Sequence, residues 1–212
     1  MGGYPIVRDG YIFIFAALVL GVLMYLAFGV YGVIFPVVLA FYFAYFFRNP
    51  HRTIDMDESL IVSPADGTVQ DVVELDDDEF LHEPCRKVII FLSVFNVHVN
   101  RSPIAGKVTY QKYICGRFMP AYTDEVGFEN ERHLLGIEND KMRITVTQIA
   151  GILARRIVSW VTLDDTMEKG QVYGLIKFAS CTEIVVPRNV EIQVKKGDKV
   201  RGGESIIGRV IE

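Results

Sequence analysis

The sequence predicts a mainly β, β-rich α+β soluble domain with hammerhead-like or hybrid-like strands, preceded by an N-terminal transmembrane helical hairpin. The excess of apolar residues, 50% over the whole chain, is concentrated in the first quarter. Short Val-, Ile- and Thr-rich runs separated by Gly-Asp and Gly-Gly turns follow it to the C-terminus, which is typical of a strand-rich domain. A chain of 212 residues has room for a membrane segment and one such domain. We therefore predict an anchoring hairpin over residues 1–48 and one strand-rich domain over residues 49–212.

The hairpin follows from a long uncharged stretch. No charged residue occurs between residues 11 and 47, and this stretch is too long for one span of about 20 residues. Glycines and a proline between residues 29 and 36 supply a break. We expect two spans, residues 11–28 and 33–47. The length of the apolar stretch and the absence of a small-residue cleavage site disfavour a cleaved signal peptide.

Basic residues flank the apolar stretch on both sides, and they predict its orientation. They are Arg8 before it and Arg48, His51 and Arg52 after it. Because basic flanks stay on the cytoplasmic side, we expect the soluble domain on the cytoplasmic face of the cell membrane. The aromatic residues 41–47 are typical of an interfacial belt that holds this domain at the headgroups. Two interpretations stay open, a bare anchor and an anchor that brings an active site to a lipid substrate.

Charge and cysteine content exclude several functions. The net charge is −4 and the pI about 5.6, so no broad basic field is available for nucleic acid. The three cysteines share no CxxC or Cys/His spacing, which argues against a zinc site and a disulfide framework. The acidic segment 71–79, with its run at residues 76–79, lacks the ligand spacing and the glycine of a calcium loop, and we interpret it as a solvated hairpin tip. We predict no metal site.

Two polar positions in the first half of the domain are candidates for catalysis. Asp66 precedes a glycine in a turn signal, and we expect it at a tight corner that enters a strand. His98 lies in a mostly apolar run, residues 87–103, where strand alternation would put it on the face opposite Val97 and Val99. A plain turn and a core histidine are the alternatives. The polar residues that follow His98, among them Asn100, favour an active site at one strand end.

Residues 110–137 are less periodic, and they predict either a long loop over a site or the membrane, or ordinary core packing. Farther along, Arg155 and Arg156 are adjacent, so on a strand they would face opposite ways. One of them would suit a phosphate or carboxylate through forked hydrogen bonds, and a surface ion pair is the alternative.

A serine stands in the strand predicted over residues 174–187. β-rich runs flank this strand on both sides, so the hydroxyl of Ser180 would be held in a rigid position. The C-terminal residues 187–210 resemble the small hammerhead units of lipoyl and biotinyl domains, but they lack the carrier lysine.

Several motifs occur in an order that resembles the phosphatidylserine decarboxylase family, in the short membrane-anchored form that includes archaetidylserine decarboxylases. The resemblance runs from about Arg48 to the end of the chain. It rests on Ser-Pro-Ala-Asp-Gly (residues 63–67), Phe-Asn-Val-His-Val-Asn-Arg-Ser-Pro (95–103), Glu-Asn-Glu-Arg (129–132), Gln-Ile-Ala-Gly-x-x-Ala-Arg-Arg-Ile (148–157) and Lys-Phe-x-Ser (177–180).

This resemblance implies a self-processing enzyme whose cofactor is a pyruvoyl group made from Ser180. The matching triad is Asp66, His98 and Ser180, with His98 as base on Ser180 and Asp66 orienting His98. Cleavage between Ala179 and Ser180 would give a large and a small chain. The pyruvoyl group would take the amine of a phospholipid's serine headgroup as a Schiff base and act as electron sink during loss of CO2.

The resemblance also suggests substrate contacts and leaves some questions open. We expect Arg155 or Arg156 at the headgroup phosphate, and Asn100 and His133 as further substrate contacts. Diacyl and archaeal ether lipids are equally compatible with the sequence as substrates. The many short strands leave edges that a homodimer would cover.

One residue departs from the family pattern. The family usually has glycine before the serine, whereas this chain has Ala179. A methyl group there restricts φ and crowds the carbonyl that Ser180 must attack. We expect Ala179 to slow or block cleavage and to keep the chain as a proenzyme.

Two functions from other classes compete with this one. A non-enzymatic membrane adaptor or carrier would use the hammerhead-like strands and would not depend on Asp66, His98 or Ser180. A serine hydrolase is disfavoured because no Gly-x-Ser-x-Gly elbow surrounds Ser180.

Overall fold

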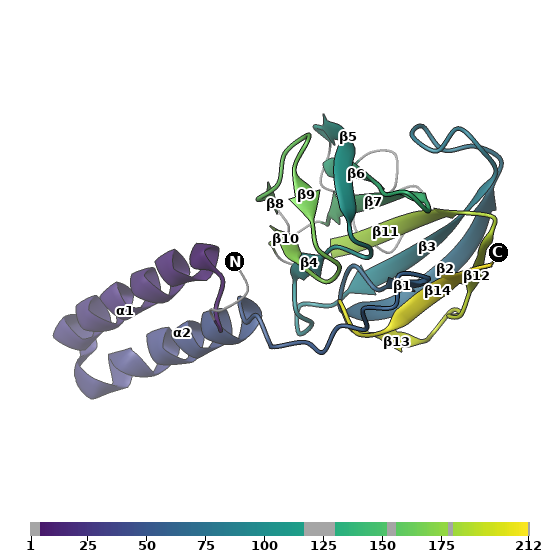
Figure 1. The fold of residues 1–212 in the computed structure, drawn as a ribbon. Helices are drawn as coiled ribbons and strands as arrows, with labels where there is room; N and C mark the ends of the chain where they lie inside the picture. Colours follow the sequence, from purple (N-terminus) through teal and green to yellow (C-terminus); the bar gives the residue numbers. More distant parts are fainter. Residues whose placement is uncertain (1–4, 117–129, 152–155, 178–179, 212) are drawn as a thin grey trace. The chain divides into compact units, whose positions relative to one another are not determined.

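The computed structural model describes residues 5–116, 130–151, 156–177 and 180–211 (Figure 1). The chain divides into two compact units, Met1–His51 and Arg52–Glu212. The first unit is helical and apolar, and the second is built of strands. The predicted fold class, a β-rich domain after an apolar helical segment, is thereby confirmed.

The first unit contains two packed helices, α1 (Arg8–Phe28) and α2 (Ile34–Phe46), joined by a 3-10 turn, η1 (Gly29–Val33). Gly29 ends α1 with a φ of +64°, a conformation that side chains other than glycine's rarely adopt. The start of α1 and the end of α2 lie side by side, since the N–H of Val7 donates to the carbonyl of Phe47 at 3.0 Å. The helical segment Arg8–Phe46 is long and apolar enough to cross a membrane.

The second unit is organised around a strongly curved eight-stranded antiparallel sheet (Figure 1). Its strand order is β13-β2-β3-β11-β7-β6-β5-β9, and β11 lies between β3 and β7. The strands are β2 (Gly67–Leu75), β3 (Cys85–Leu92), β5 (Gly106–Ile114), β6 (Arg132–Glu138), β7 (Arg143–Ala150), β9 (Thr166–Met167), β11 (Ser180–Pro187) and β13 (Lys199–Val200).

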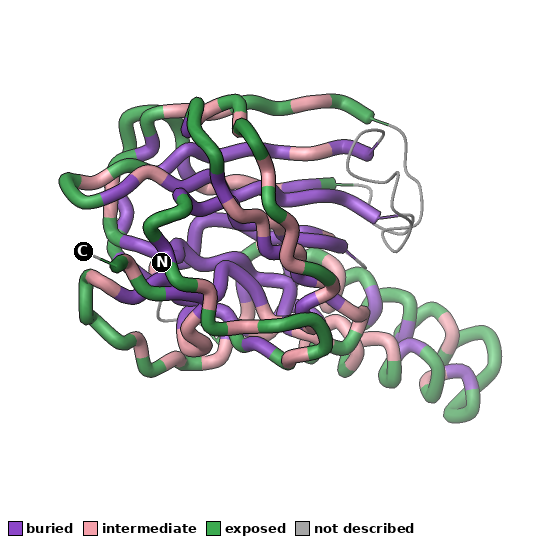
Figure 2. Tube along the Cα trace, turned by 90° about the vertical axis from the view of Figure 1, so that its right-hand side faces the viewer, coloured by how far each residue is buried: buried purple, intermediate pink, exposed green. Residues whose placement is uncertain are grey.

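Two three-stranded sheets complete this unit. One has the order β1 (Leu60–Val62), β14 (Ile206–Val210), β12 (Val190–Ile192), and the other has the order β4 (Val99–Arg101), β10 (Val172–Ile176), β8 (Ile157–Ser159). Alternate apolar residues of the large sheet form one core with residues of the smaller sheets, and Figure 2 shows these buried positions along the central strands. Fully burying each aliphatic side chain contributes roughly 1.5–3 kcal/mol, so the central strands are the most firmly held.

The apolar run at residues 87–103 forms two strands, β3 and β4, instead of one. The side chain of Asn96 causes the break: its Oδ1 accepts from the N–H of Ser93 at 2.9 Å and from the hydroxyl of Ser93 at 2.7 Å. Such local bonds offer the backbone an alternative to the ladder. The alternation argument for His98 was therefore wrong. His98 precedes β4, and both it and its neighbours Val97 and Val99 are buried.

Other expected elements also have different limits. The strand predicted over residues 174–187 is divided into β10 and β11. The loop predicted over residues 110–137 is wrong at both ends, where β5 and β6 pair as a hairpin, and residues 117–129 lie outside the described part of the chain. Arg156 directly precedes β8, so it is not on a strand, and Arg155 lies outside the described residues. The predicted C-terminal glycine turns are confirmed by positive φ at Gly197 and Gly203.

Candidate active site

The residues predicted to be catalytic lie at one end of the large sheet. Ser180 opens β11 and stands opposite Leu92 at the end of β3 and Ala150 at the end of β7. β2 begins at this end as well, because Thr68 of β2 and Cys181 of β11 both pair with Phe91 of β3. The turn after β3 therefore lies beside the first residue of β11, and the corner before β2 lies one strand farther along the same end of the sheet (Figure 1).

Ser180 is fully buried. Its Oγ makes no hydrogen bond to any of the described residues. A buried hydroxyl without a partner costs about 1–3 kcal/mol, and native proteins rarely keep one without a function. The next residue, Cys181, is also buried, and burial raises the pKa of its thiol far above the usual range, so it is an inert thiol at neutral pH. The hydroxyl of Ser180 is the better nucleophile candidate at this strand end.

His98 is fully buried in the segment between β3 and β4, and its ring orientation is set by the backbone. Its Nδ1 lies 3.0 Å from the carbonyl oxygen of Asn96. Because a carbonyl only accepts, Nδ1 carries the proton and Nε2 carries the lone pair. The backbone carbonyl of His98 accepts from the N–H of Ile176 at 3.2 Å, which ties this segment to β10 just before Ser180. The Nε2 atom of His98 is thus the basic atom of the ring.

Asp66 stands at the corner predicted for it. Arg52 holds its carboxylate with two hydrogen bonds, of 2.9 and 2.7 Å, and the N–H of Gly202 donates to it at 2.8 Å. Arg52 also donates to Glu204 at 3.0 Å. The corner requires Gly67, because a Cβ there would lie 2.3 Å from the carbonyl oxygen of Phe91. The charged carboxylate is therefore fixed at the site, and its orienting role toward His98 stays a prediction.

Arg52→Ala should lower the free energy of unfolding by about 2 kcal/mol, because it removes charge-assisted hydrogen bonds from two partly buried carboxylates. The matched control is Arg188→Ala, which removes an exposed contact to Glu74 at 3.5 Å and should cost at most about 0.5 kcal/mol. Denaturant unfolding of the two variants checks this. An equal loss of unfolding free energy in both variants would contradict the stabilising role of the Arg52 hydrogen bonds.

Asn100 and His133 belong to one buried hydrogen-bonded chain. His133 Nδ1 lies 3.1 Å from Gln148 Oε1, and Gln148 Nε2 donates to Asn100 Oδ1 at 2.9 Å. Asn100 Nδ2 donates to Thr182 Oγ1 at 3.1 Å, two residues after Ser180 on β11. At the other end of the chain, Gln111 Nε2 lies 2.9 Å from His133 Nε2. The structure thus brings both predicted residues together behind Ser180, while their contact with substrate stays a prediction.

The stability of the protein should decrease as the pH falls below about 6.5, the ordinary pKa of histidine. Burial lowers the pKa of His133, and the hydrogen bond to Gln148 opposes this only in part. The folded state then favours neutral His133. The contribution of neutral His133 to folding stability is therefore fully present above pH 6.5 and is lost as the pH falls through the lowered pKa. His133→Gln should reduce this loss in thermal unfolding scans. The control His82→Gln, at an exposed position, should keep the parent's pH dependence, and an identical dependence in all three proteins would contradict the assignment.

Arg156 is exposed, and it too lies near this end of the sheet. Its carbonyl accepts from the N–H of Lys177 at 3.2 Å. Burial, together with a hydrogen bond donated to Glu131, raises the pKa of Tyr113 to about 12, and the nearby guanidinium of Arg156 opposes this rise. The guanidinium of Arg156 is therefore exposed and near Tyr113, and its contact with a headgroup phosphate stays a prediction. The residues of the other two predictions at this end, Arg155 and Ala179, lie outside the described part of the chain.

Three residues of the site were not predicted: Arg52, Glu131 and Gln148. Glu131 and Gln148 lie inside motifs that carried the resemblance, and Arg52 lies in the basic flank that was interpreted only as an orientation signal. A polar residue inside an otherwise apolar strand, such as Gln148, was the signal that could have identified a buried network.

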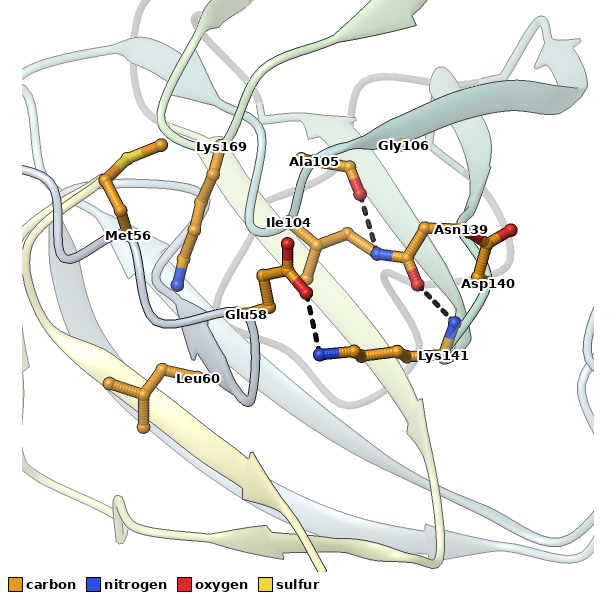
Figure 3. Close-up of a pocket in the computed structure, with 10 residues that line it drawn as sticks. All are labelled: Met56, Glu58, Leu60, Ile104, Ala105, Gly106, Asn139, Asp140, Lys141 and Lys169. Carbon is orange, nitrogen blue, oxygen red and sulfur yellow. Dashed lines mark hydrogen bonds and ion pairs between the residues drawn. The ribbon is translucent and has the colours of Figure 1, made fainter.

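A cavity of about 320 Å³ lies elsewhere, beside the turn between β6 and β7 (Figure 3). This turn is at the end of β7 opposite to Ala150, the partner of Ser180. One ion pair at the cavity is the 2.7 Å bond between Lys141 and Glu58. The cavity is therefore separate from the candidate active site. Within the described residues there is also no group of three or more His, Cys, Asp or Glu side chains that could hold a metal ion.

Comparison with known proteins gives consistent matches. A model of the family described as phosphatidylserine decarboxylase matches residues 39–208. A phosphatidylserine decarboxylase proenzyme of Carboxydothermus hydrogenoformans is 49% identical over 173 residues, 81% of each chain. One of Symbiobacterium thermophilum is 44% identical over 206 residues, which is 97% of this chain and 95% of the relative.

Proposed function

Because this chain belongs to the phosphatidylserine decarboxylase family, we propose that it is a membrane-anchored phospholipid decarboxylase that makes its own pyruvoyl group from Ser180. Its substrate is a phosphatidylserine-type or archaetidylserine lipid, and its products are the ethanolamine lipid and CO2. The family match supports the decarboxylase activity. The self-processing chemistry and the site residues are our proposal.

The observation that carries the proposal is the buried Oγ of Ser180, which makes no hydrogen bond among the described residues. A buried serine with a structural role would donate to a nearby carbonyl, as Ser63 and Ser102 do just after β1 and β4, each at 2.7 Å. An unsatisfied hydroxyl at the start of a central strand is better explained by a reaction at that oxygen. This is also the residue whose carbon skeleton would hold the pyruvoyl group.

Self-processing would proceed through an ester. Ser180 Oγ attacks the carbonyl carbon of residue 179, and the amide C–N bond breaks as the new C–O bond forms. The hydroxyl proton passes to His98 Nε2, and the freed amine of residue 180 takes up a proton. Elimination then removes the Cα proton and breaks the Cβ–Oγ bond, so residue 179 leaves with a free carboxylate. Water replaces the nitrogen of the resulting dehydroalanine, ammonia departs, and a pyruvoyl group remains at residue 180.

His98 is suited to the proton transfers because its Nδ1 proton is engaged by the Asn96 carbonyl, so Nε2 is the atom that accepts. Asp66 supplies a fixed carboxylate at the same end of the sheet, and we assign it the role of orienting His98. A pyruvoyl group at residue 180 would supply an electron sink for loss of CO2 from a serine headgroup. The exposed guanidinium of Arg156 is our choice for the headgroup phosphate.

The anchor serves this reaction by keeping the enzyme at its lipid substrate. The apolar segment Arg8–Phe46 is long enough to cross a membrane. The basic flanks favour a catalytic domain on the cytoplasmic side of the cell membrane.

The experiment that tests the proposal incubates the purified Ala179→Gly chain with vesicles of phosphatidylserine and, in a parallel arm, of an ether-linked serine lipid. Mass spectrometry of the extracted lipid should find the ethanolamine lipid in at least one arm, and the arm identifies the substrate class. A chain that has cleaved but produces no ethanolamine lipid in either arm would contradict the proposed function. The adaptor alternative predicts that result.

A further inference from the structure

The buried hydrogen bonds behind Ser180 all run in one direction. Gln111 has an amide N–H at His133 Nε2, so that nitrogen accepts and His133 Nδ1 donates to Gln148 Oε1. Gln148 then donates to Asn100, and Asn100 donates to Thr182. Each bond polarises the next, and together they hold each amide in one orientation. The direction is set from β5 toward β11, the strand that carries Ser180.

This series of hydrogen bonds joins two different sheets. Asn100 lies on β4 of a small sheet, and Thr182 lies on β11 of the large sheet. Two residues before Asn100 is His98, and two residues before Thr182 is Ser180. Ser180 and Thr182 share one face of β11, because residues two apart on a strand do so. His98, in contrast, directly precedes β4 and is tied to β10 by the bond from the N–H of Ile176 to its carbonyl. The bond between Asn100 and Thr182 therefore fixes how the segment of the proposed base lies against the strand of the proposed nucleophile.

Gln148 is the junction of this arrangement. It is fully buried on β7 and stands in register with both Thr182 on β11 and His133 on β6. β10 passes close to its amide: a Cβ on Gly174 would lie 2.8 Å from Gln148 Nε2 and 2.6 Å from the carbonyl oxygen of Val158. The amide of Gln148 is thus held by the backbone packed on it and by a partner at each of its polar atoms.

We propose that Gln148 is a positioning residue of self-processing: by orienting Asn100 it sets the approach of His98 to Ser180. The inference rests on the proposed function and adds a residue that does not itself touch the reacting atoms. Displacement of a catalytic group by about 1 Å costs on the order of 100-fold in rate, so loss of this junction should slow cleavage strongly.

The test uses the Ala179→Gly chain as parent and follows cleavage by denaturing electrophoresis from pH 5 to pH 9. Gln148→Leu removes both hydrogen bonds and should slow cleavage by about 10- to 100-fold. The matched control is Thr145→Val, at a position on the same strand as Gln148 but far from Ser180. It removes a part-buried 2.8 Å hydrogen bond from Thr145 to Asp78 and should cleave at the parent rate.

Gln148→Glu separates positioning from mere packing. A protonated glutamic acid reproduces the pattern of glutamine, accepting from His133 and donating to Asn100, whereas the ionised form cannot donate. Burial raises the pKa of such a carboxyl. At temperatures where both chains stay folded, the ratio of the Gln148→Glu rate to the parent rate should therefore rise as the pH falls, whereas a residue that takes no part in self-processing predicts a constant ratio.

The outcomes decide between the two ideas. A slow Gln148→Leu variant with an unaffected control, together with a pH-dependent Gln148→Glu ratio, supports the positioning role. A parent that cleaves and a Gln148→Leu variant that cleaves equally fast overturn this inference and leave the proposed function intact. If Gln148→Leu does not fold, the Gln148→Glu ratio decides, and a flat ratio overturns the inference. A parent that does not cleave overturns both the inference and the proposed function.

Discussion

Replacing Ala179 with glycine should convert a largely intact chain into two fragments, residues 1–179 and residues 180–212. Glycine removes the methyl group beside the carbonyl that Ser180 attacks and opens backbone conformations that alanine reaches only with strain. A strain of about 1–3 kcal/mol corresponds to roughly 5- to 160-fold in cleavage rate. Denaturing electrophoresis over time measures that rate in both chains.

A suitable control is Ala105→Gly, which makes the same chemical change at an exposed position outside the site and should leave cleavage unchanged. Complete splitting of the unmodified chain would contradict the role given to Ala179. So would equal rates in the Ala179→Gly chain and the unmodified chain.

Replacing Ser180 with alanine in the Ala179→Gly chain should abolish cleavage and lipid decarboxylation together, because both depend on the same oxygen and carbon skeleton. Thermal stability should stay the same or increase, since the substitution removes a buried hydroxyl that has no partner among the described residues. Electrophoresis, lipid analysis and thermal unfolding of one preparation measure all three.

The combination of lost activity and retained stability is what distinguishes a nucleophile from a structural serine. The control Ser59→Ala removes a hydroxyl that bonds Asp57 at 2.8 Å in a turn, and it should retain both reactions. Ethanolamine lipid produced by the Ser180→Ala chain would contradict the proposed cofactor, because no pyruvoyl group can arise from alanine.

Features that depend on neighbours in the sequence could be predicted from it. The apolar first quarter, the Asp66 corner and the glycine turns near the C-terminus follow from composition and turn chemistry. The alternation argument for His98 failed because it depended on an unbroken strand, and the side chain of Asn96 ends that strand by bonding to Ser93.

Features that depend on distant strands could not be predicted in this way. The polar chain from Gln111 to Thr182 draws its members from β4, β5, β6, β7 and β11, and only the order of strands in the sheets brings them together. Arg52 meets Asp66 and Glu204 for the same reason, since Glu204 is 152 positions away in the chain. A single sequence contains no register information over such separations.

The central claim is that Ser180 becomes a pyruvoyl group, and the intact mass of the fragment of residues 180–212 from the Ala179→Gly chain tests it most directly. A pyruvoyl terminus makes this fragment lighter by one ammonia than the same fragment with an N-terminal serine, and the mass should increase on treatment with a carbonyl reagent. A fragment that retains the mass of an N-terminal serine and does not react with that reagent would contradict the claim, because it would show simple hydrolysis before Ser180.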